Sequence, residues 1–297
     1  MRDMPPRDAA LTMHLGIDIG TSSVKAVLID EDGTCVERRV APLTVQRPSS
    51  LWSEQDPEAW WSATSSCVRD LPVQLRSDLH SIGLSGQMHG ATLLGSDDAP
   101  LRPCILWNDG RSSLEARELE RRAPGLRRIS GNKAMAGFTA PKLLWVARHE
   151  PDVFSRVSRV LLPKDYVRLR LTGEYATDPS DASGTLWFDV ARRQWSEELL
   201  AATGLTRAAM PRVVEGNAIS GIVRRDVGRE LGIPAVPVVG GGGDNAAGAV
   251  AIGAVEAGRA LISLGTSGVY FVATDRHRPD AEHGVHAFCH ALPDRWH

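Results

Sequence analysis

The chain has 297 residues, of which 42% are hydrophobic, and its 34 lysines and arginines against 36 acidic residues give a formal net charge of −2. This composition is that of a globular protein with room for roughly two domains, and it excludes a fibre or a wholly disordered chain. Because the basic residues are scattered among acidic ones, the sequence offers no basic face, and we expect no nucleic-acid partner.

The sequence shows no pattern typical of a membrane or export segment. No apolar stretch approaches the ~18 residues that a membrane span needs, and residues 1–14 lack the apolar core of a secretory signal. We therefore expect a cytoplasmic protein without a membrane partner. The cysteines are far apart and form no CxxC pair, which favours reduced thiols over a disulfide framework. They are Cys35, Cys67, Cys104 and Cys289.

The first part of the chain predicts an extension followed by three strands. Residues 1–12 contain two prolines and alternating charges, so we expect a loose extension, with the fold starting at Met13. Short apolar stretches separated by Gly, Asp and Ser turns then predict an antiparallel meander. Its strands are expected within residues 14–20, 23–30 and 35–43.

A helix is predicted within residues 53–71, where Pro57 suits the first helical turn. Its apolar residues recur at roughly helical spacing: Trp60, Trp61, Ala63 and Cys67. Together with Trp52, these tryptophans are interpreted as core or interface packing rather than as a platform for a sugar. Residues 81–95 then return to strand, turn and strand.

The remaining elements indicate an α/β protein. Residues 113–204 are mostly helical by composition, with capping and breaking residues at intervals. Residues 235–244, "AVPVVGGGGD", begin as an apolar run that predicts a strand covered on both faces. Strands and helices mixed in this order are typical of the α/β class.

One stretch of sequence occurs twice. "IGTSSVKAV" at residues 19–27 is echoed by "LGTSGVYFV" at 264–272, and each copy follows an apolar strand. The shared order of Gly, Thr, Ser and Val favours two copies of one hairpin, although these residues are common enough for a chance match. Two copies predict two related lobes, the second beginning near residue 255.

The first copy has the composition of a phosphate clamp. Gly20 allows a sharp turn in which backbone N–H groups and hydroxyls converge on phosphate oxygens, and Asp18 can hold a magnesium ion or its waters. The other candidate ligands are Thr21, Ser22, Ser23 and Lys25. An ordinary hairpin rich in turn residues is the alternative for one copy alone. The second copy, with Ser263 in the place of Asp18, favours a pair of clamps on a nucleotide.

Asp244 is the candidate catalytic base. The four glycines before it allow a ligand to lie against the backbone, and its carboxylate could accept a proton from an alcohol that attacks phosphorus. Phosphoryl transfer needs little more than such a base, a magnesium ion and positioned donors. The alternative role for Asp244 is a helix N-cap, and the two roles are compatible.

Two competing site types are weakly supported. No GxxxxGK[ST] motif occurs, and the nearest match to a dinucleotide fingerprint has its acid inside the motif, so hydride transfer is a poor candidate. That match consists of Gly241, Gly243 and Ala246. The stretch "HGVHAFCH" suggests zinc, but no second ligand pair at standard spacing accompanies it, which favours strand and loop packing. Its candidate ligands are His283, His286, Cys289 and His290.

Eight ordered segments resemble the FGGY carbohydrate kinases, which have the actin-like ATPase (ribonuclease H-like) fold. They are "GIDIGTSSVKAVLID", "LWSEQDPEAWW", "GLSGQMHGATLL", "RPCILWNDGR", "GFTAPKLLWV", "LLPKDYVRLRLTGE", "GGGGDNAAGAV" and "SLGTSGVYF". The resemblance runs from about Leu15 to the last residue and is strongest to members that act on D-xylulose. It implies an α/β lobe with a mixed sheet, ATP and Mg²⁺ as cofactors, and phosphorylation of the sugar.

The resemblance also implies roles for single residues. Asp244 is similar to the family's catalytic base, which takes a proton from the O5 hydroxyl of D-xylulose, and Asp18 to its magnesium-associated aspartate. Thr21, Ser22 and Ser23 resemble the first phosphate loop, and Gly265 and Thr266 the second. Met88 and His89 match the pair placed against the sugar, where relatives acting on glycerol carry Arg-Glu, and Asn245 is a further sugar-binding candidate.

Trp107, Asn108 and Asp109 are weaker candidates, since "WND" fits a sugar neighbour and a turn at the end of a strand equally well. The family continues for roughly another lobe, ~150 to 200 residues. We therefore expect a sugar-binding lobe at 13–254 and a truncated start of the ATP-binding lobe at 255–297. A sugar kinase, a sugar-binding remnant without turnover, a kinase for another ketose or polyol, and a homodimer all stay open.

Overall fold

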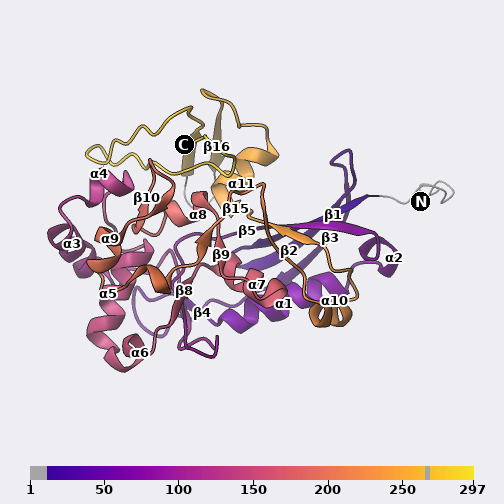
Figure 1. Cartoon of the computed structure of the whole chain (residues 1–297), viewed down its shortest axis with the longest axis horizontal. Helices are drawn as coiled ribbons and strands as arrows, with labels where there is room; N and C mark the ends of the chain where they lie inside the picture. Colours follow the sequence, from indigo (N-terminus) through magenta and orange to yellow (C-terminus); the bar gives the residue numbers. More distant parts are fainter. Residues whose placement is uncertain (1–11, 265–267) are drawn as a thin grey trace.

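A mixed β-sheet forms the centre of the computed structural model (Figure 1), which describes residues 12–264 and 268–297. The sheet has the order β13-β14-β5-β1-β2-β3, and β15 pairs with β5. Its strands are β1 (Met13–Ile19), β2 (Ser23–Ile29), β3 (Cys35–Pro42), β5 (Leu79–Gly86), β13 (Ile219–Ile222), β14 (Pro237–Val239) and β15 (Gly242–Gly243). The expected α/β class with a mixed sheet is confirmed.

The predicted meander is present, since β1, β2 and β3 pair antiparallel. Alternate residues of β1 point to opposite faces: Leu15 and Ile17 are buried in the core, whereas Gly16 and Asp18 face outward. Strand β5 runs parallel to β1, and β14 and β15 run parallel to β5. The carboxyl ends of these strands therefore meet at one edge of the sheet, the place where open α/β sheets bind ligands.

Three helices cover the inner face of the sheet: α1 (Pro57–Arg69), α7 (Pro163–Thr172) and α10 (Arg225–Leu231). Helix α1 begins as predicted, with Pro57 in its first turn and Asp56 capping the backbone N–H of Glu58. Trp60 is fully buried against this face, and its indole N–H donates to Gln55. Burying one large apolar side chain contributes about 1.5–3 kcal/mol. The complete burial of Trp60 therefore agrees with the packing interpretation of the tryptophans.

A second, mainly helical layer lies on one side of the sheet (Figure 1) and has its own apolar core. Its helices are α3 (Ser113–Arg122), α4 (Leu126–Ser130), α5 (Thr139–His149), α6 (Pro151–Ser155), α8 (Pro179–Ser183), α9 (Glu197–Ala201) and the 3₁₀ turn η1 (Arg207–Ala209). Short strand pairs join them: β4 (Glu54–Gln55) with β7 (Cys104–Ile105), β6 (Thr92–Leu94) with β8 (Arg159–Leu161), β9 (Ala176–Thr177) with β12 (Arg212–Val213), and β10 (Phe188–Asp189) with β11 (Gln194–Trp195). Helix α2 (Val73–Arg76) lies near the start of β5.

The predicted strand at 235–244 is shorter and less covered than expected. Strand β14 ends at Val239, which is only partly buried, and the chain turns at Gly241, whose φ is +76°. A Cβ atom on Gly240 would lie 2.3 Å from the carbonyl oxygen of Glu215. The glycines are therefore required by close backbone approach, which also interrupts the strand.

The second hairpin forms as expected. Strands β16 (Ala260–Leu264) and β17 (Gly268–Val272) pair antiparallel, with Ser263 opposite Val269. Gly265 and Thr266, the predicted second phosphate loop, lie outside the described residues, as do residues 1–11 of the expected extension. Helix α11 (Asp244–Ala251) connects the glycine run to this hairpin.

The histidine-containing stretch packs as a loop, as favoured over zinc binding. His286 contacts Asn132 through its Nδ1 atom at 3.1 Å, and His290 Nε2 lies 3.2 Å from the carbonyl oxygen of Ala254. Within residues 12–264 and 268–297, no group of three or more His, Cys, Asp or Glu side chains could hold a metal ion. None of the helices described is long and apolar enough to cross a membrane.

Candidate active site

The first loop of the site is a tight turn between β1 and β2. The backbone N–H of Gly20 donates to the carbonyl of Ser23 at 3.0 Å, and a Cβ atom on Gly20 would lie 3.0 Å from that same oxygen. Asp18 faces outward just before the turn, with Lys25 Nζ 3.6 Å from its Oδ2 atom. Because both side chains are partly exposed, this ion pair contributes about 1 kcal/mol at most, and both groups remain accessible. Ser22 is exposed at the tip.

The Thr21 hydroxyl is engaged in a hydrogen-bond network. It donates to Gln87 Oε1 at 3.0 Å and accepts from the indole N–H of Trp107 at 3.0 Å. Gln87 also donates to Gln55, which donates to the Thr21 carbonyl at 2.7 Å. This network ties the turn to the cleft beside it. Sequence analysis missed both glutamines, although Gln87 directly precedes the predicted pair Met88-His89.

Asp244 is the first residue of α11, and Gly243 occupies the N-cap position without a side-chain cap. The N-cap alternative for Asp244 is therefore wrong. Its Oδ1 atom instead accepts from the backbone N–H of Asn245 at 2.7 Å. Solvent reaches the carboxylate, but protein surrounds it closely enough that loss of bulk water raises its pKa to about 6, and the negative charge of Asp18 acts in the same direction.

A cleft of about 720 Å³ is lined by Asn245, the residue directly after Asp244, and by residues of the second hairpin and the loop that follows it. The predicted sugar residues Met88, His89 and Asn245 all line it, together with Trp107 and Phe138. Met88 is buried against the glycine run, because a Cβ atom on Gly243 would lie 2.9 Å from its sulfur. The structure thus brings the predicted sugar residues together at the carboxyl edge of β5 and β15.

His89 is held in one orientation by its backbone conformation and by two neighbours. Its backbone has a φ of +68°, its Nδ1–H donates to the Gly184 carbonyl at 2.7 Å, and its ring lies 4.7 Å from that of Phe138. Loss of water around the ring, and then the charge of Lys142, lower its pKa to about 3. The imidazole is therefore neutral at pH 7, and its Nε2 atom is a hydrogen-bond acceptor.

Lys142, which sequence analysis did not single out, helps to hold the backbone of His89 in place. Its fully buried ammonium donates to the carbonyls of His89 and Gly137 at 2.7 and 2.8 Å. Burial lowers its pKa to about 7. The clamp on the carbonyl of His89 holds a backbone conformation that non-glycine residues seldom adopt.

The three residues of "WND" are interpreted either as neighbours of the sugar or as a turn at the end of a strand, and they differ in which interpretation they fit. Asp109 is buried, accepts from the backbone N–H of Ser53 at 2.6 Å and pairs with Arg111, as a turn residue does. Trp107, by contrast, is 41% exposed and lines the cleft. Asn108 is exposed beside it.

The fold is an α/β lobe of the actin-like kind. Its features are the mixed sheet, the glycine-rich carboxyl edge of that sheet, and the carboxylates of Asp18 and Asp244 near that edge. Over residues 13–251 the sequence matches the N-terminal domain of the FGGY family of carbohydrate kinases. The chain belongs to that family.

Relatives and solved structures agree with this assignment. The chain is 54% identical to a xylulose kinase of Escherichia coli over 286 residues, which are 96% of this chain and 59% of the relative. It is 55% identical to a xylulose kinase of Klebsiella pneumoniae, again over 96% of this chain and 59% of the relative. The crystal structure of a xyloylose kinase from Brucella ovis superposes with a TM-score of 0.93 at 52% identity, covering 96% of this chain and 59% of that one. The chain thus spans about three fifths of the length of these relatives.

Proposed function

We propose that this chain contributes the sugar-binding lobe and the catalytic base of a kinase that transfers the γ-phosphoryl group of ATP to D-xylulose, giving D-xylulose 5-phosphate. The observation that carries the proposal is the placement of Asp244, a carboxylate with a raised pKa, directly before Asn245, which lines the cleft with Met88 and His89, and within reach of the charge of Asp18. The proposal is supported by the relatives, which are xylulose kinases.

In the proposed reaction Asp244 acts as general base. Above pH ~6 its carboxylate is ionised and accepts the proton of the O5 hydroxyl as that oxygen attacks phosphorus. The neutral His89 accepts a hydrogen bond from another sugar hydroxyl through Nε2, and Met88 packs beside it. Asn245, at the wall of the cleft, supplies an amide for a further hydroxyl. These residues hold the sugar in line, which is most of what phosphoryl transfer requires.

The residues around the first turn fit a magnesium nucleotide. The outward carboxylate of Asp18 offers the oxygen ligands that Mg²⁺ prefers, and its charge acts on Asp244 in the structure. The exposed Ser22 of this turn and Lys25 of β2 are candidate phosphate donors. ATP would supply the phosphoryl group, and its Mg²⁺ ion would neutralise part of the negative charge of the phosphates. Thr21 serves through its backbone, because its hydroxyl is already bonded to Gln87.

Two measurements test the proposal. Calorimetry on the 297-residue chain should show D-xylulose binding, with weaker or no binding of glycerol. Coupled ADP release should be measured on a chimera in which the C-terminal part of the Escherichia coli relative follows residue 297. D-xylulose-dependent ADP release by the chimera, abolished in Asp244→Asn, is the expected result. A chimera that prefers another ketose or a polyol would overturn the substrate, and sugar binding without turnover would favour a binding protein.

A further inference from the structure

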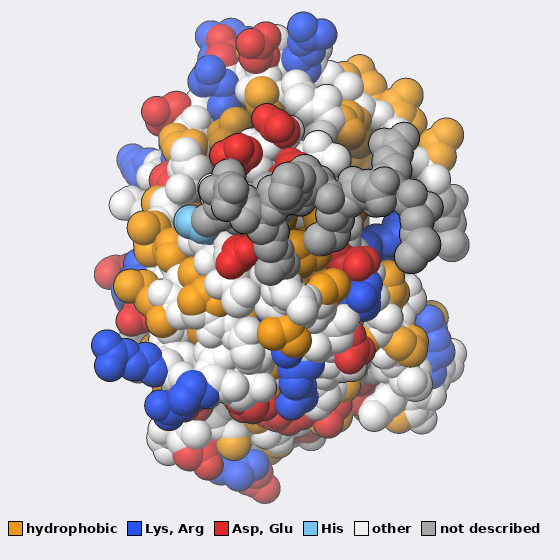
Figure 2. Space-filling model, turned by 90° about the vertical axis from the view of Figure 1, so that its right-hand side faces the viewer, with side chains coloured by type: hydrophobic (Ala, Val, Ile, Leu, Met, Phe, Trp, Pro, Cys, Tyr) orange, Lys and Arg blue, Asp and Glu red, His pale blue; other side chains and the backbone are white. Residues whose placement is uncertain are grey.

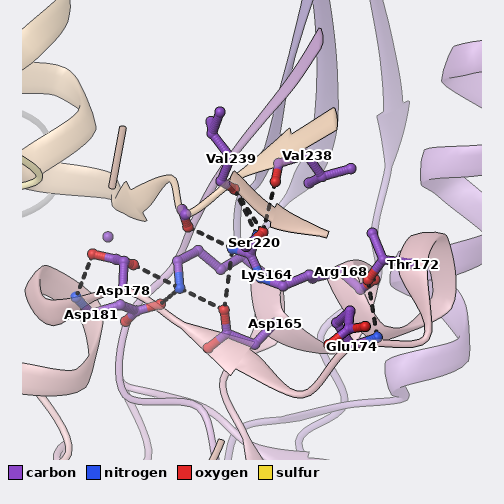
Figure 3. Close-up of polar contacts among 12 residues, drawn as sticks. Lys164, Asp165, Arg168, Thr172, Glu174, Asp178, Asp181, Ser220, Val238 and Val239 are labelled. Atoms are coloured by element: carbon purple, nitrogen blue, oxygen red, sulfur yellow. Dashed lines mark hydrogen bonds and ion pairs between the residues drawn. The ribbon is translucent and has the colours of Figure 1, made fainter. Parts of the chain in front are cut away.

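A fully buried ion cluster, drawn in Figure 3, contacts the glycine run through Arg168, which donates to the carbonyl of Gly240. Lys164 Nζ is 2.7 Å from Asp165, 2.9 Å from Asp178 and 3.0 Å from Asp181, and Arg168 lies 3.6 Å from Asp165. All five side chains have no solvent exposure. They come from α7 and from the start of α8, two elements that flank the carboxyl edge of the sheet.

Stability alone does not account for this cluster. Removing each ion from water costs several kcal/mol, and replacing buried ion pairs by well-packed apolar residues is often neutral or favourable. Burial holds the pKa of Asp181 well above its usual range, and the neighbouring carboxylates of Asp165 and Asp178 act in the same direction, against the attraction of Lys164. The role of the cluster is therefore sought in the residues that it contacts rather than in its contribution to the stability of the fold.

At one end the cluster holds the entrance to the glycine run. Arg168 donates through Nη1 to the carbonyl of Val239 at 2.7 Å and through Nη2 to that of Gly240 at 2.5 Å. It also donates to the hydroxyl of Ser220, which in turn donates to the carbonyl of Val238 at 2.8 Å. The last residues of β14 are thus fixed by one guanidinium.

At the other end the cluster holds the exit. The backbone N–H of Gly243 donates to Ser180 Oγ at 3.1 Å, and the hydroxyl of Ser180 donates to Asp178. Asp178 is the carboxylate that faces Lys164 at 2.9 Å. Because the Ser180 proton points at Asp178, an oxygen lone pair is left for Gly243, the residue directly before Asp244.

We propose that Ser180, oriented by Asp178 and Lys164, and Arg168 are positioning residues that fix the glycine run at both ends and so aim the carboxylate of Asp244. Four consecutive glycines have no side chains with which to anchor themselves and the largest backbone freedom of any residue. Backbone pairing with β5 and with residues 216 and 218 holds part of the run, and the anchors from α7 and α8 add side-chain bonds at its two ends. The consequence for the reaction rests on the proposed function, because Asp244 is the base only if the chain takes part in the proposed phosphoryl transfer.

Ser180→Ala tests the exit anchor, and Ser183→Ala is its matched control. Ser183 is also fully buried on α8, and its hydroxyl accepts from a backbone N–H, that of Cys289, at 3.1 Å. Each variant therefore removes the same kind of bond, but only Ser180 touches the glycine run. In the 297-residue chain without sugar, Ser180→Ala should speed amide hydrogen exchange at Gly243 by about fivefold to tenfold and shift the carboxyl carbon resonance of Asp244. Ser183→Ala should change neither.

The same pair separates positioning from structural support in turnover. In the chimera, Ser180→Ala should lower kcat by about tenfold or more, because misplacing a reacting group is costly, while KM for D-xylulose stays within about threefold. Equal behaviour of the two serine variants, or a Gly243 amide in the unmodified chain that exchanges like an exposed one, overturns the proposal. Should Ser180→Ala not fold, Ser180→Cys keeps the side-chain size with a weaker acceptor. Exchange and resonance results as expected in a chain that binds no D-xylulose would refute only the proposed function.

Discussion

The same physical cause, loss of bulk water, shifts the pKa values of Asp244 and His89 in opposite directions. Loss of bulk water disfavours the charged form of any group. For the acid Asp244 this raises the pKa to about 6, and for the base His89 it lowers the pKa to about 3. At pH 7 the proposed site therefore contains one ionised carboxylate, suited to accept a proton, and one neutral ring, suited to accept a hydrogen bond from a hydroxyl. In this proposal the environment, rather than the residue type, separates the two roles.

The rate of the reaction should follow the ionisation of Asp244. Since the base must be deprotonated, kcat/KM for D-xylulose in the chimera should level off above about pH 7 and fall as the pH drops through about 6. Asp244→Asn should lower kcat about 10²- to 10⁴-fold and leave the D-xylulose dissociation constant within a few fold, because the shape is kept. An Asn variant with near-normal turnover would remove Asp244 from the mechanism.

His89 should affect the sugar and not the nucleotide. In the chimera, His89→Ala removes one hydrogen bond to a hydroxyl, so KM for D-xylulose should rise about threefold to tenfold, with KM for Mg-ATP unchanged. His283→Ala is the control, since its exposed ring bonds only to the nearby Asp280 at 2.7 Å. Parallel losses for both substrates in His89→Ala would mean that the ring supports the fold and does not contact the sugar.

At the scale of elements, local patterns predicted what local forces decide. The meander and α1 were correct because alternation and an N-terminal proline act within a few residues. The strand at 235–244 was too long because close contacts with Glu215 and Leu84, distant in sequence, shape Gly240 and Gly241. The anchoring cluster was missed because Lys164 and its neighbours look like an exposed helix face. The burial of Lys164 depends on ion pairs with Asp178 and Asp181, which come from the start of α8.

The turn after α8 should control the geometry of His89. A Cβ atom on Gly184 would lie 2.5 Å from the His89 ring and 3.0 Å from Met88, so Gly184→Ala must displace both. Calorimetry should show D-xylulose affinity reduced by about tenfold or more with the fold retained. Gly248→Ala is the control: nothing lies within 4 Å of its Cβ position in α11, and it should stabilise the chain by about 0.5–1 kcal/mol. Unchanged affinity in Gly184→Ala would show that sugar binding does not depend on His89 and Met88.

At the scale of the molecule, charge and apolar surface are distributed differently. On the face in Figure 2, basic and acidic side chains alternate with hydrophobic ones, and the described residues form no basic expanse there. The outward face of the central sheet instead contains an apolar groove of about 520 Å³. Gly16 and Gly83 lie side by side in its floor, and Val27 and Ile29 flank them. Because Gly16 and Gly83, paired on adjacent strands, have no side chains, backbone and apolar side chains are open to a neighbouring molecule at this groove.

The 297-residue chain alone should therefore bind D-xylulose, turn over little and associate with itself. The residues proposed to contact the sugar all precede residue 255, and residues of the second hairpin and of the loop after it complete the cleft. Kinases of this kind depend on lobe closure to exclude water, and the chain spans 59% of the length of its Escherichia coli relative. Sedimentation velocity should show concentration-dependent association, because exposed apolar surface favours it, and the Val27→Thr, Ile29→Thr double variant should weaken it while leaving D-xylulose affinity unchanged. Turnover by the unextended chain at ~1 to 100 per second, the usual range for kinases, would show that the described lobe and hairpin are sufficient. Association that persists unchanged in the double variant would place the contact elsewhere than in the sheet groove.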